Sequence, residues 1–162
     1  MVDLEKAIRS LSGNKVDFVI VGGVAITLHS SGYVTSDLDI CYSRSKGNIN
    51  RLVSALAQFR PWPRGLSRDL PFFFDESTLK NGTNFTFETS IGDIDLLGEV
   101  KGIGDFYDVI KRSVLYEIFD SEVRALDLTG LILAKTAAGR PKDHLVLPEL
   151  HALREALDPD EE

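Results

Sequence analysis

The spacing of hydrophobic residues along the chain changes between helical and strand-like periods. Leu4, Ala7, Ile8 and Leu11 recur at helical spacing, which predicts a helix over residues 3–12. The compact apolar run 18–21 predicts a buried strand. The same criteria predict helices at 24–30, 48–59, 106–111, 128–138 and 142–157, and strands at 36–42, 91–97, 114–119 and 123–126.

The segment between the second and third predicted strands is less regular. Pro61, Pro63 and Gly65 predict a loop over 60–70, and residues 71–97 are expected to be rich in β-structure. Within that stretch, Asn81-Gly82 is the dipeptide typical of a hairpin turn. The whole pattern predicts one α/β (α+β) domain over 1–157, with a mixed sheet, flanking helices and C-terminal helices. Residues 158–162 form an acidic tail.

Composition fits one intracellular domain. The chain has 162 residues, of which 43% are hydrophobic, enough for a core. Its net charge of -7 argues against binding nucleic acid by bulk charge, but a local basic patch stays open. Cys41 is the sole cysteine, so no internal disulfide forms. We expect a cytoplasmic protein without a signal peptide or membrane span.

Two short motifs carry the candidate chemistry. Gly22-Gly23 follows a predicted strand and precedes a helix, where backbone N–H groups approach an anion with no Cβ in the way. Asp37 and Asp39 lie two apart on a predicted strand, so their carboxylates share one face. Such a pair repels unless a hard divalent cation lies between its members, and Mg²⁺ binds one or two carboxylates together with phosphate oxygens.

These motifs and their spacing resemble those of the DNA polymerase β-like nucleotidyltransferases. The matching segments are Val21-Gly22-Gly23 and Asp37-Leu38-Asp39-Ile40. The sequence around them is most similar to the sequences of small bacterial members. Those members include the abortive-infection-type toxin nucleotidyltransferases and the minimal nucleotidyltransferases. The resemblance implies the nucleotidyltransferase fold, with nucleotide contacts at Gly22, Gly23, Thr35 and Ser36. An Arg common in such members is replaced here by Tyr33.

The resemblance also implies a third carboxylate on a neighbouring strand. Asp95 is the first candidate and Asp93, on the same strand face, is the reserve. Together with Asp37 and Asp39 it would hold two Mg²⁺ ions when an NTP such as ATP is bound, and would help to deprotonate the acceptor hydroxyl.

A second region of resemblance lies near the C-terminus. It implies that Lys135 binds the β- and γ-phosphates, assisted by Arg140 and Lys142. Asp143 is expected to cap the last helix or to orient Lys135. A lysine whose aliphatic stem packs on an apolar helix is an equally good interpretation of Lys135.

The main functional hypothesis is Mg²⁺-dependent transfer of a nucleoside monophosphate from an NTP to a hydroxyl of RNA, protein or a small molecule. The resemblance favours tRNA or protein targets, as for a toxin paired with an antitoxin partner. Alternatives are a catalytically silent nucleotide-binding or partner-binding module of the same fold, and an interaction protein that uses loop 60–75 and its run 72–74.

Three further features have less specific interpretations. His29 is expected at a helix end and Cys41 in the core. Trp62, with Arg60, Arg64 and Arg68, forms a basic aromatic segment that would suit a base or a phosphate. An exposed loop with scattered charges is the favoured interpretation of that segment.

Overall fold

The computed structural model describes residues 1–29 and 36–157. In this part the main strands are β1 (Phe18–Val21), β2 (Asp37–Tyr42), β3 (Trp62–Pro63), β4 (Asn84–Thr89), β5 (Gly92–Leu97), β8 (Ser113–Ile118) and β9 (Ser121–Leu126). They form one sheet in the order β3-β4-β5-β2-β1-β9-β8. A small separate ribbon pairs β6 (Glu99–Val100) with β7 (Gly104–Asp105).

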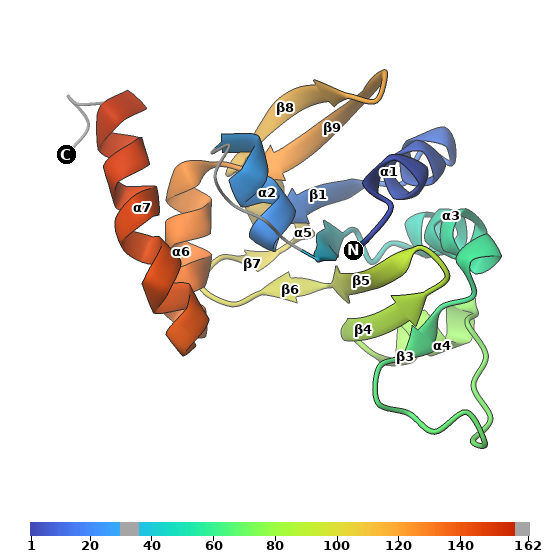
Figure 1. The fold of residues 1–162 in the computed structure, drawn as a ribbon. Coiled ribbons are helices and arrows are strands. Elements are labelled where there is room, and N and C mark those ends of the chain that lie inside the picture. Colours follow the sequence, from blue (N-terminus) through green and yellow to red (C-terminus); the bar gives the residue numbers. More distant parts are fainter. Residues whose placement is uncertain (30–35, 158–162) are drawn as a thin grey trace.

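Helices cover the sheet and extend beyond one end of it (Figure 1). They are α1 (Leu4–Gly13), α2 (Gly22–His29), α3 (Lys46–Leu56), α4 (Glu76–Asn81), α5 (Phe106–Ile110), α6 (Leu128–Ala138) and α7 (Pro141–Leu157), with a 3-10 turn at Ala57–Phe59. Helices α1 and α3 contact each other, while α6 contacts α2 and α7. No helix among the described residues is both long and apolar enough to cross a bilayer.

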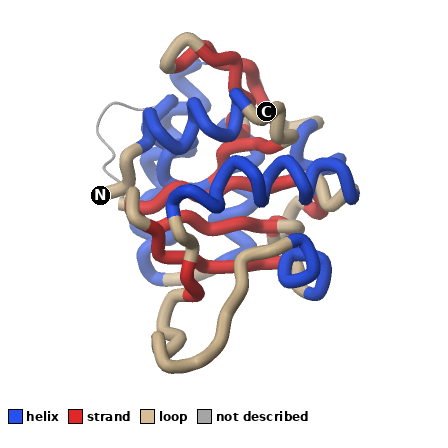
Figure 2. The backbone as a smooth tube through the Cα atoms, turned by 90° about the vertical axis from the view of Figure 1, so that its right-hand side faces the viewer, coloured by secondary structure: helices blue, strands red, loops and turns tan. Residues whose placement is uncertain are grey.

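The sheet is mixed, and its centre fixes the register of the acidic motif. Strand β1 is antiparallel to β2 and parallel to β9, while β2 is parallel to β5. Val21 therefore lies opposite Asp39, and Asp39 lies opposite Asp95. Figure 2 shows the strands in this layered arrangement, with the loop between β3 and α4 extending away from the sheet.

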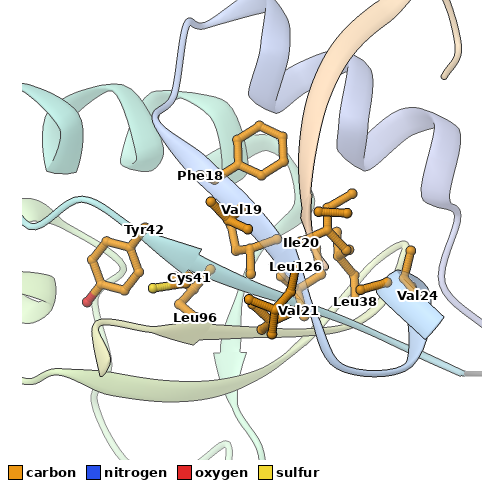
Figure 3. Close-up of a cluster of buried hydrophobic side chains, with 14 of the residues drawn as sticks. Phe18, Val19, Ile20, Val21, Val24, Leu38, Cys41, Tyr42, Leu96 and Leu126 are labelled. Carbon is orange, nitrogen blue, oxygen red and sulfur yellow. The ribbon is translucent and has the colours of Figure 1, made fainter. Parts of the chain in front are cut away.

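The core is built on the apolar positions of the central strands. All four residues of β1 are buried, and alternate residues of β2 and β5 are buried on one face. Figure 3 shows side chains of β1 and β2 packed together with Leu96 of β5 and Leu126 of β9. Because the apolar positions of β2 and β5 alternate with acids, burial of one face presents the acids on the other.

A buried amide ties the first two strands together. The Asn48 side chain accepts a hydrogen bond from Asp17 N at 2.7 Å and donates to Asp17 O at 3.1 Å and Ser43 O at 2.7 Å. Asn48 is fully buried, so these bonds replace the water that its amide loses. The side chain thereby anchors α3 at the start of β1 and the end of β2.

The α/β fold class predicted from the sequence is confirmed, and α6 has the predicted bounds. Helix α2 begins at Gly22, two residues earlier than expected, so the glycine pair opens the helix. The predicted helix 48–59 is divided into α3 and the 3-10 turn. The predicted loop 60–70 contains the short strand β3, which pairs with β4.

The hairpin turn predicted at Asn81-Gly82 is wrong. Asn81 is the last residue of α4, whose N-terminus is capped by the Asp75 carboxylate through Thr78 N at 2.8 Å. The hairpin joins β4 to β5 instead, where Thr89 pairs with Gly92. The helix capped by Asp75 continues to Asn81, and this local structure overrides the turn propensity of Asn81-Gly82.

The phenylalanine run 72–74 is neither a strand nor a continuous exposed patch. Phe72 and Phe74 pack against Phe87 with ring centroids 5.9 and 5.4 Å apart, while Phe73 is exposed. The loop is therefore fastened to the sheet by two of its three rings.

Leu96→Ala tests the core. Leu96 is fully buried, so removal of its side chain is expected to lower the free energy of unfolding by about 2–5 kcal/mol in urea titrations. Leu115→Ala is the matched control, because Leu115 is 51% exposed and its loss should cost less than about 0.5 kcal/mol. Similar losses in both variants would contradict the assigned core.

Candidate functional site

Four carboxylates lie on one face of β2 and β5. Asp37 and Asp39 alternate with buried residues of β2, and Asp93 and Asp95 do so on β5. The parallel register pairs Asp37 with Asp93 and Asp39 with Asp95. Neighbouring strands are about 4.8 Å apart, so paired side chains on one face come into contact.

Asp39 has the most perturbed environment of the four. Burial, followed by the nearby charge of Asp95 and its hydrogen-bonding contact and then by the charge of Asp37, raises the pKa of Asp39 from 3.8 to about 7. Asp39 Oδ1 is buried and has no hydrogen-bond partner in the described part of the chain. A buried carboxylate with an unpartnered oxygen beside a second carboxylate requires a proton or a cation.

Gly22 packs directly against this carboxylate. Its φ of 71° lies in the left-handed region, and a Cβ built at Gly22 would collide with Asp39 Oδ2. Both the backbone conformation and the close approach therefore require glycine at this position. The first glycine of the motif thus lets the start of α2 lie against the acid on the adjacent strand.

Asp95, the first candidate for the third carboxylate, is the one that contacts Asp39. It is 17% exposed, whereas Asp93 is 40% exposed and lies one pair further along the strands. Asp95 Oδ1 accepts a hydrogen bond from Arg64 Nη2 at 2.8 Å, and Arg64 Nε lies 3.4 Å from Asp93 Oδ2. Burial lowers the pKa of Arg64, but the contacts with Asp95 and Asp93 outweigh it and raise the pKa.

The three proposed metal ligands are adjacent without forming a ready-made cage. Among the described residues, no group of three His, Cys, Asp or Glu side chains is arranged to hold a metal ion. Asp95 is turned to Arg64, and Asp37 Oδ1 accepts a hydrogen bond from Ser36 Oγ at 2.9 Å. The expected convergence of three carboxylates is therefore realised only for Asp39 and Asp95, because neighbouring donors engage the other oxygens.

A pocket of about 230 Å³ opens beside Asp39. Asp39 and Gly22 lie at its acidic side, and Lys135 and Arg140 provide positive charge. The remaining lining residues are Val21, Asn84, Leu97, Glu99, Val100, Lys101, Leu131, Ala134 and Ala138. The fold thus joins the first motif to the second region across about one hundred residues of sequence.

The other predicted nucleotide contacts are placed differently. Gly23 is buried in α2, Ser36 contacts Asp37, and Lys142 is exposed in the first turn of α7; none of the three lines the pocket. Thr35 and Tyr33 lie outside the described residues. Lys135 and Arg140 are therefore the basic residues of the second motif that the fold brings to Asp39.

An ion-pair cluster holds the basic side of the pocket. Asp143 is fully buried and accepts hydrogen bonds from Lys135 Nζ at 3.0 Å and from Arg140 Nε at 2.8 Å. Burial would raise the pKa of Asp143, but the hydrogen bonds from Arg140 and Lys135 hold it well below its usual range. Asp143 therefore stays ionised and orients Lys135, one of the two roles expected for it.

Cys41 lies in the core and His29 at a helix end, as expected from the sequence. Cys41 is buried, and burial followed by the charge of Asp105 raises its pKa to about 12, so the thiol is unreactive. His29 is the last residue of α2, and its ring contacts Leu126 O at 3.0 Å and Tyr116 Oη at 2.9 Å.

Arg64 is the residue that the sequence analysis missed. It was assigned to an exposed loop, yet it reaches the acidic face from the residue after β3. The signal in the sequence is that Arg64 follows Pro63 in a segment rich in cations. The pairing of β3 with β4, which brings Arg64 to the acids, is a long-range contact. Sequence pattern alone does not predict such a pairing.

Three solved structures similar to this one are described as nucleotidyltransferases or as nucleotidyltransferase-like. LnuA, a lincosamide antibiotic adenylyltransferase with lincomycin bound, aligns with a TM-score of 0.61 at 11% identity, over 94% of this chain and 98% of LnuA. A Thermotoga maritima protein assigned as a nucleotidyltransferase gives 0.58 at 15% identity, over 94% and 96%. An antigenic nucleotidyltransferase-like protein from Paracoccidioides brasiliensis gives 0.56 at 14% identity, over 94% and 77%.

This chain has the nucleotidyltransferase fold. No protein-family model matches the chain, and no curated protein matches it in sequence. The nucleotidyltransferase fold expected from the two motifs is thus confirmed at the level of architecture, across nearly the whole chain.

Gly22→Ala tests the close approach of α2 to Asp39. The added Cβ would meet the Asp39 carboxylate and would strain a left-handed backbone, which by itself costs about 1–2 kcal/mol. We expect a lower urea midpoint than that of the unmodified chain. Gly13→Ala is the control, because its Cβ would meet no atom within 4 Å. An unchanged midpoint in Gly22→Ala would contradict the assigned contact.

Asp39→Asn tests the electrostatics of the metal-free protein. Because the pKa of Asp39 is raised in the folded state, the contribution of this group to stability is fully present below pH 3.8 and is lost as the pH rises to about 7. In EDTA, Asp39→Asn should therefore unfold at higher urea than the unmodified chain at pH 8, with little difference near pH 4. Asp69→Asn, in the exposed loop, should show no such pH-dependent gain. A less stable Asp39→Asn at pH 8 would disprove the assignment.

Proposed function

We propose that this protein is an Mg²⁺-dependent nucleotidyltransferase that moves a nucleoside monophosphate from an NTP to an acceptor hydroxyl. One observation carries the proposal: the Asp39 carboxylate, with a buried and unpartnered oxygen, contacts Asp95 and borders a pocket that Lys135 and Arg140 also line. Metal-bound triphosphate has the complementary charge pattern, a divalent cation at one side and phosphate oxygens at the other. The fold shared with LnuA supports this assignment.

The donor set suits a hard divalent cation. Asp37, Asp39 and Asp95 offer carboxylate oxygens alone, which Mg²⁺ prefers, and the repulsion between Asp39 and Asp95 would be relieved by such an ion. When bound, two Mg²⁺ ions would polarise the phosphates and lower the pKa of the acceptor hydroxyl. Rotation of the Asp37 and Asp95 side chains from their present partners would complete the ligand set.

The chain's own residues supply the remaining steps. The acceptor oxygen attacks the α-phosphorus, the bond from that phosphorus to the oxygen bridging to the β-phosphate breaks, and pyrophosphate leaves. Asp95 takes the proton of the acceptor hydroxyl, while Lys135 and Arg140 stabilise the negative charge on the leaving pyrophosphate. Gly22 lets the start of α2 lie directly against Asp39, beside the pocket that would hold the triphosphate.

The acceptor is the finer part of the proposal. The similarity of the first motif to abortive-infection-type toxins favours tRNA or a protein, and an antitoxin partner would follow from that role. LnuA, by its description, acts on a lincosamide antibiotic, so a small hydroxyl compound is a second class. The net charge of -7 disfavours RNA over the other two.

Transfer of label from α-labelled NTPs tests the proposal. Each of the four NTPs is incubated with Mg²⁺ and one of three acceptor pools: tRNA, lysate protein or small polyhydroxylated compounds. The double variant Asp37→Ala/Asp39→Ala should lose all transfer. Asp95→Asn should lose roughly 10²-fold or more as a general base, whereas the matched Asp93→Asn should lose less than about tenfold.

The outcomes separate the candidate functions. Binding of NTP without transfer to any pool would overturn the enzyme proposal in favour of the silent nucleotide-binding module. Failure to bind any NTP in the presence of Mg²⁺ would overturn both. Greater loss in Asp93→Asn than in Asp95→Asn would move the third carboxylate to Asp93.

A further inference from the structure

The Arg64 guanidinium lies where the acidic face needs positive charge. Its Nη2 donates to Asp95 Oδ1 at 2.8 Å, and its Nε lies 3.4 Å from Asp93 Oδ2. Resting on the proposed function, we propose that Arg64 is a positioning residue that occupies the place of a cation at Asp95 in the metal-free protein and releases that carboxylate when a divalent metal binds.

Arg64 is held in place independently of the acids. Its backbone N–H donates to Thr86 O at 2.9 Å, which continues the pairing of β3 with β4. Nη2 also donates to Phe87 O at 3.3 Å. The guanidinium therefore has a backbone anchor on β4 that remains when Asp95 turns away. This anchoring gives the side chain two states, with Asp95 bound or free.

Charge balance explains why a cation belongs there. Asp37, Asp39, Asp93 and Asp95 share one sheet face, and Asp39 is buried against Asp95. Arg64 donates a hydrogen bond to Asp95 and lies within ion-pair distance of Asp93. Arg64 compensates Asp93 and Asp95, so the face tolerates its acids until metal arrives.

Arg64 and a bound metal ion would compete for the Asp95 carboxylate. Asp95 Oδ1 accepts the short hydrogen bond from Arg64, and a metal ion that takes Asp95 must displace or weaken that bond. Arg64 consequently lowers metal affinity while it holds the Asp95 side chain on the face where the metal binds. A residue with a merely structural role would not oppose metal binding.

The same turn offers a matched control. Arg68 pairs with Glu88 at 2.7 Å and its guanidinium lies 4.8 Å from the centroid of the Trp62 ring; within the described part of the chain it makes no ion pair with Asp93 or Asp95. Removal of either arginine changes the net charge by the same amount and in the same segment. The difference between the two variants therefore isolates the contact of Arg64 with the carboxylates.

Mn²⁺ titration of the full chain tests the proposal without turnover. Binding is measured by electron paramagnetic resonance at 0.15 M KCl for the unmodified protein, Arg64→Gln, Arg64→Lys and Arg68→Gln. We expect Arg64→Gln to bind Mn²⁺ about fivefold more tightly, or about 1 kcal/mol at 1.4 kcal/mol per tenfold, the range of a partly exposed ion pair. Arg68→Gln should differ by less than about twofold, and Arg64→Lys should lie between.

Thermal unfolding provides the second readout. In EDTA, Arg64→Gln should melt below Arg68→Gln, because its acids lose their counter-charge, and excess Mn²⁺ should remove most of that difference. A loss that Mn²⁺ does not restore would indicate a structural role alone and would overturn the proposal. Arg64→Lys keeps the charge and supplies the answer if Arg64→Gln does not fold.

Other outcomes are equally decisive. Weaker or unchanged Mn²⁺ binding in Arg64→Gln, relative to Arg68→Gln, would overturn the competition while leaving the proposed function intact. Absence of Mn²⁺ binding in every folded variant, including the unmodified chain, would overturn the proposed function and this inference with it.

Discussion

The contact between the Asp39 and Asp95 carboxylates is the interaction around which the site is organised. Adjacent parallel strands force the two side chains together, and burial removes the water that would screen them. Such a pair is tolerated only with a shared proton, a nearby cation or a bound metal. Arg64 is such a cation, because its guanidinium contacts Asp95. Gly22 allows the backbone of α2 to approach Asp39 closely.

The order of the central strands turns three distant segments into one site. Strand β2 lies between β1 and β5, so the end of β1, the acids of β2 and those of β5 meet on one face. The opposite faces of β2 and β5 pack into the core, which fixes their register, because a slip by one residue would bury the acids. Asn48 adds a second lock by joining α3 to the ends of β1 and β2.

Lys135 and Arg140 bring positive charge to the pocket of an acidic chain. Asp143 fixes Lys135 and Arg140, which line the same pocket as Asp39. The net charge of -7 therefore conceals a local division, with carboxylates on the sheet and cations on α6 and at the start of α7. This division matches a metal-bound triphosphate better than a long polyanion, which would need an extended basic surface.

The sequence by itself determined the local elements and the first motif. Periodicity defined α6 and the central strands closely, because burial of one face imposes a period that is visible in the residues themselves. It also indicated Gly22 and the Asp37/Asp39 pair, since their chemistry depends on neighbours in sequence. Only the tertiary structure paired Asp95 with Asp39, brought Arg64 to the acidic face and replaced the expected turn at Asn81 by a helix end. These features depend on strand pairing and side-chain caps, which are decided by packing between distant segments.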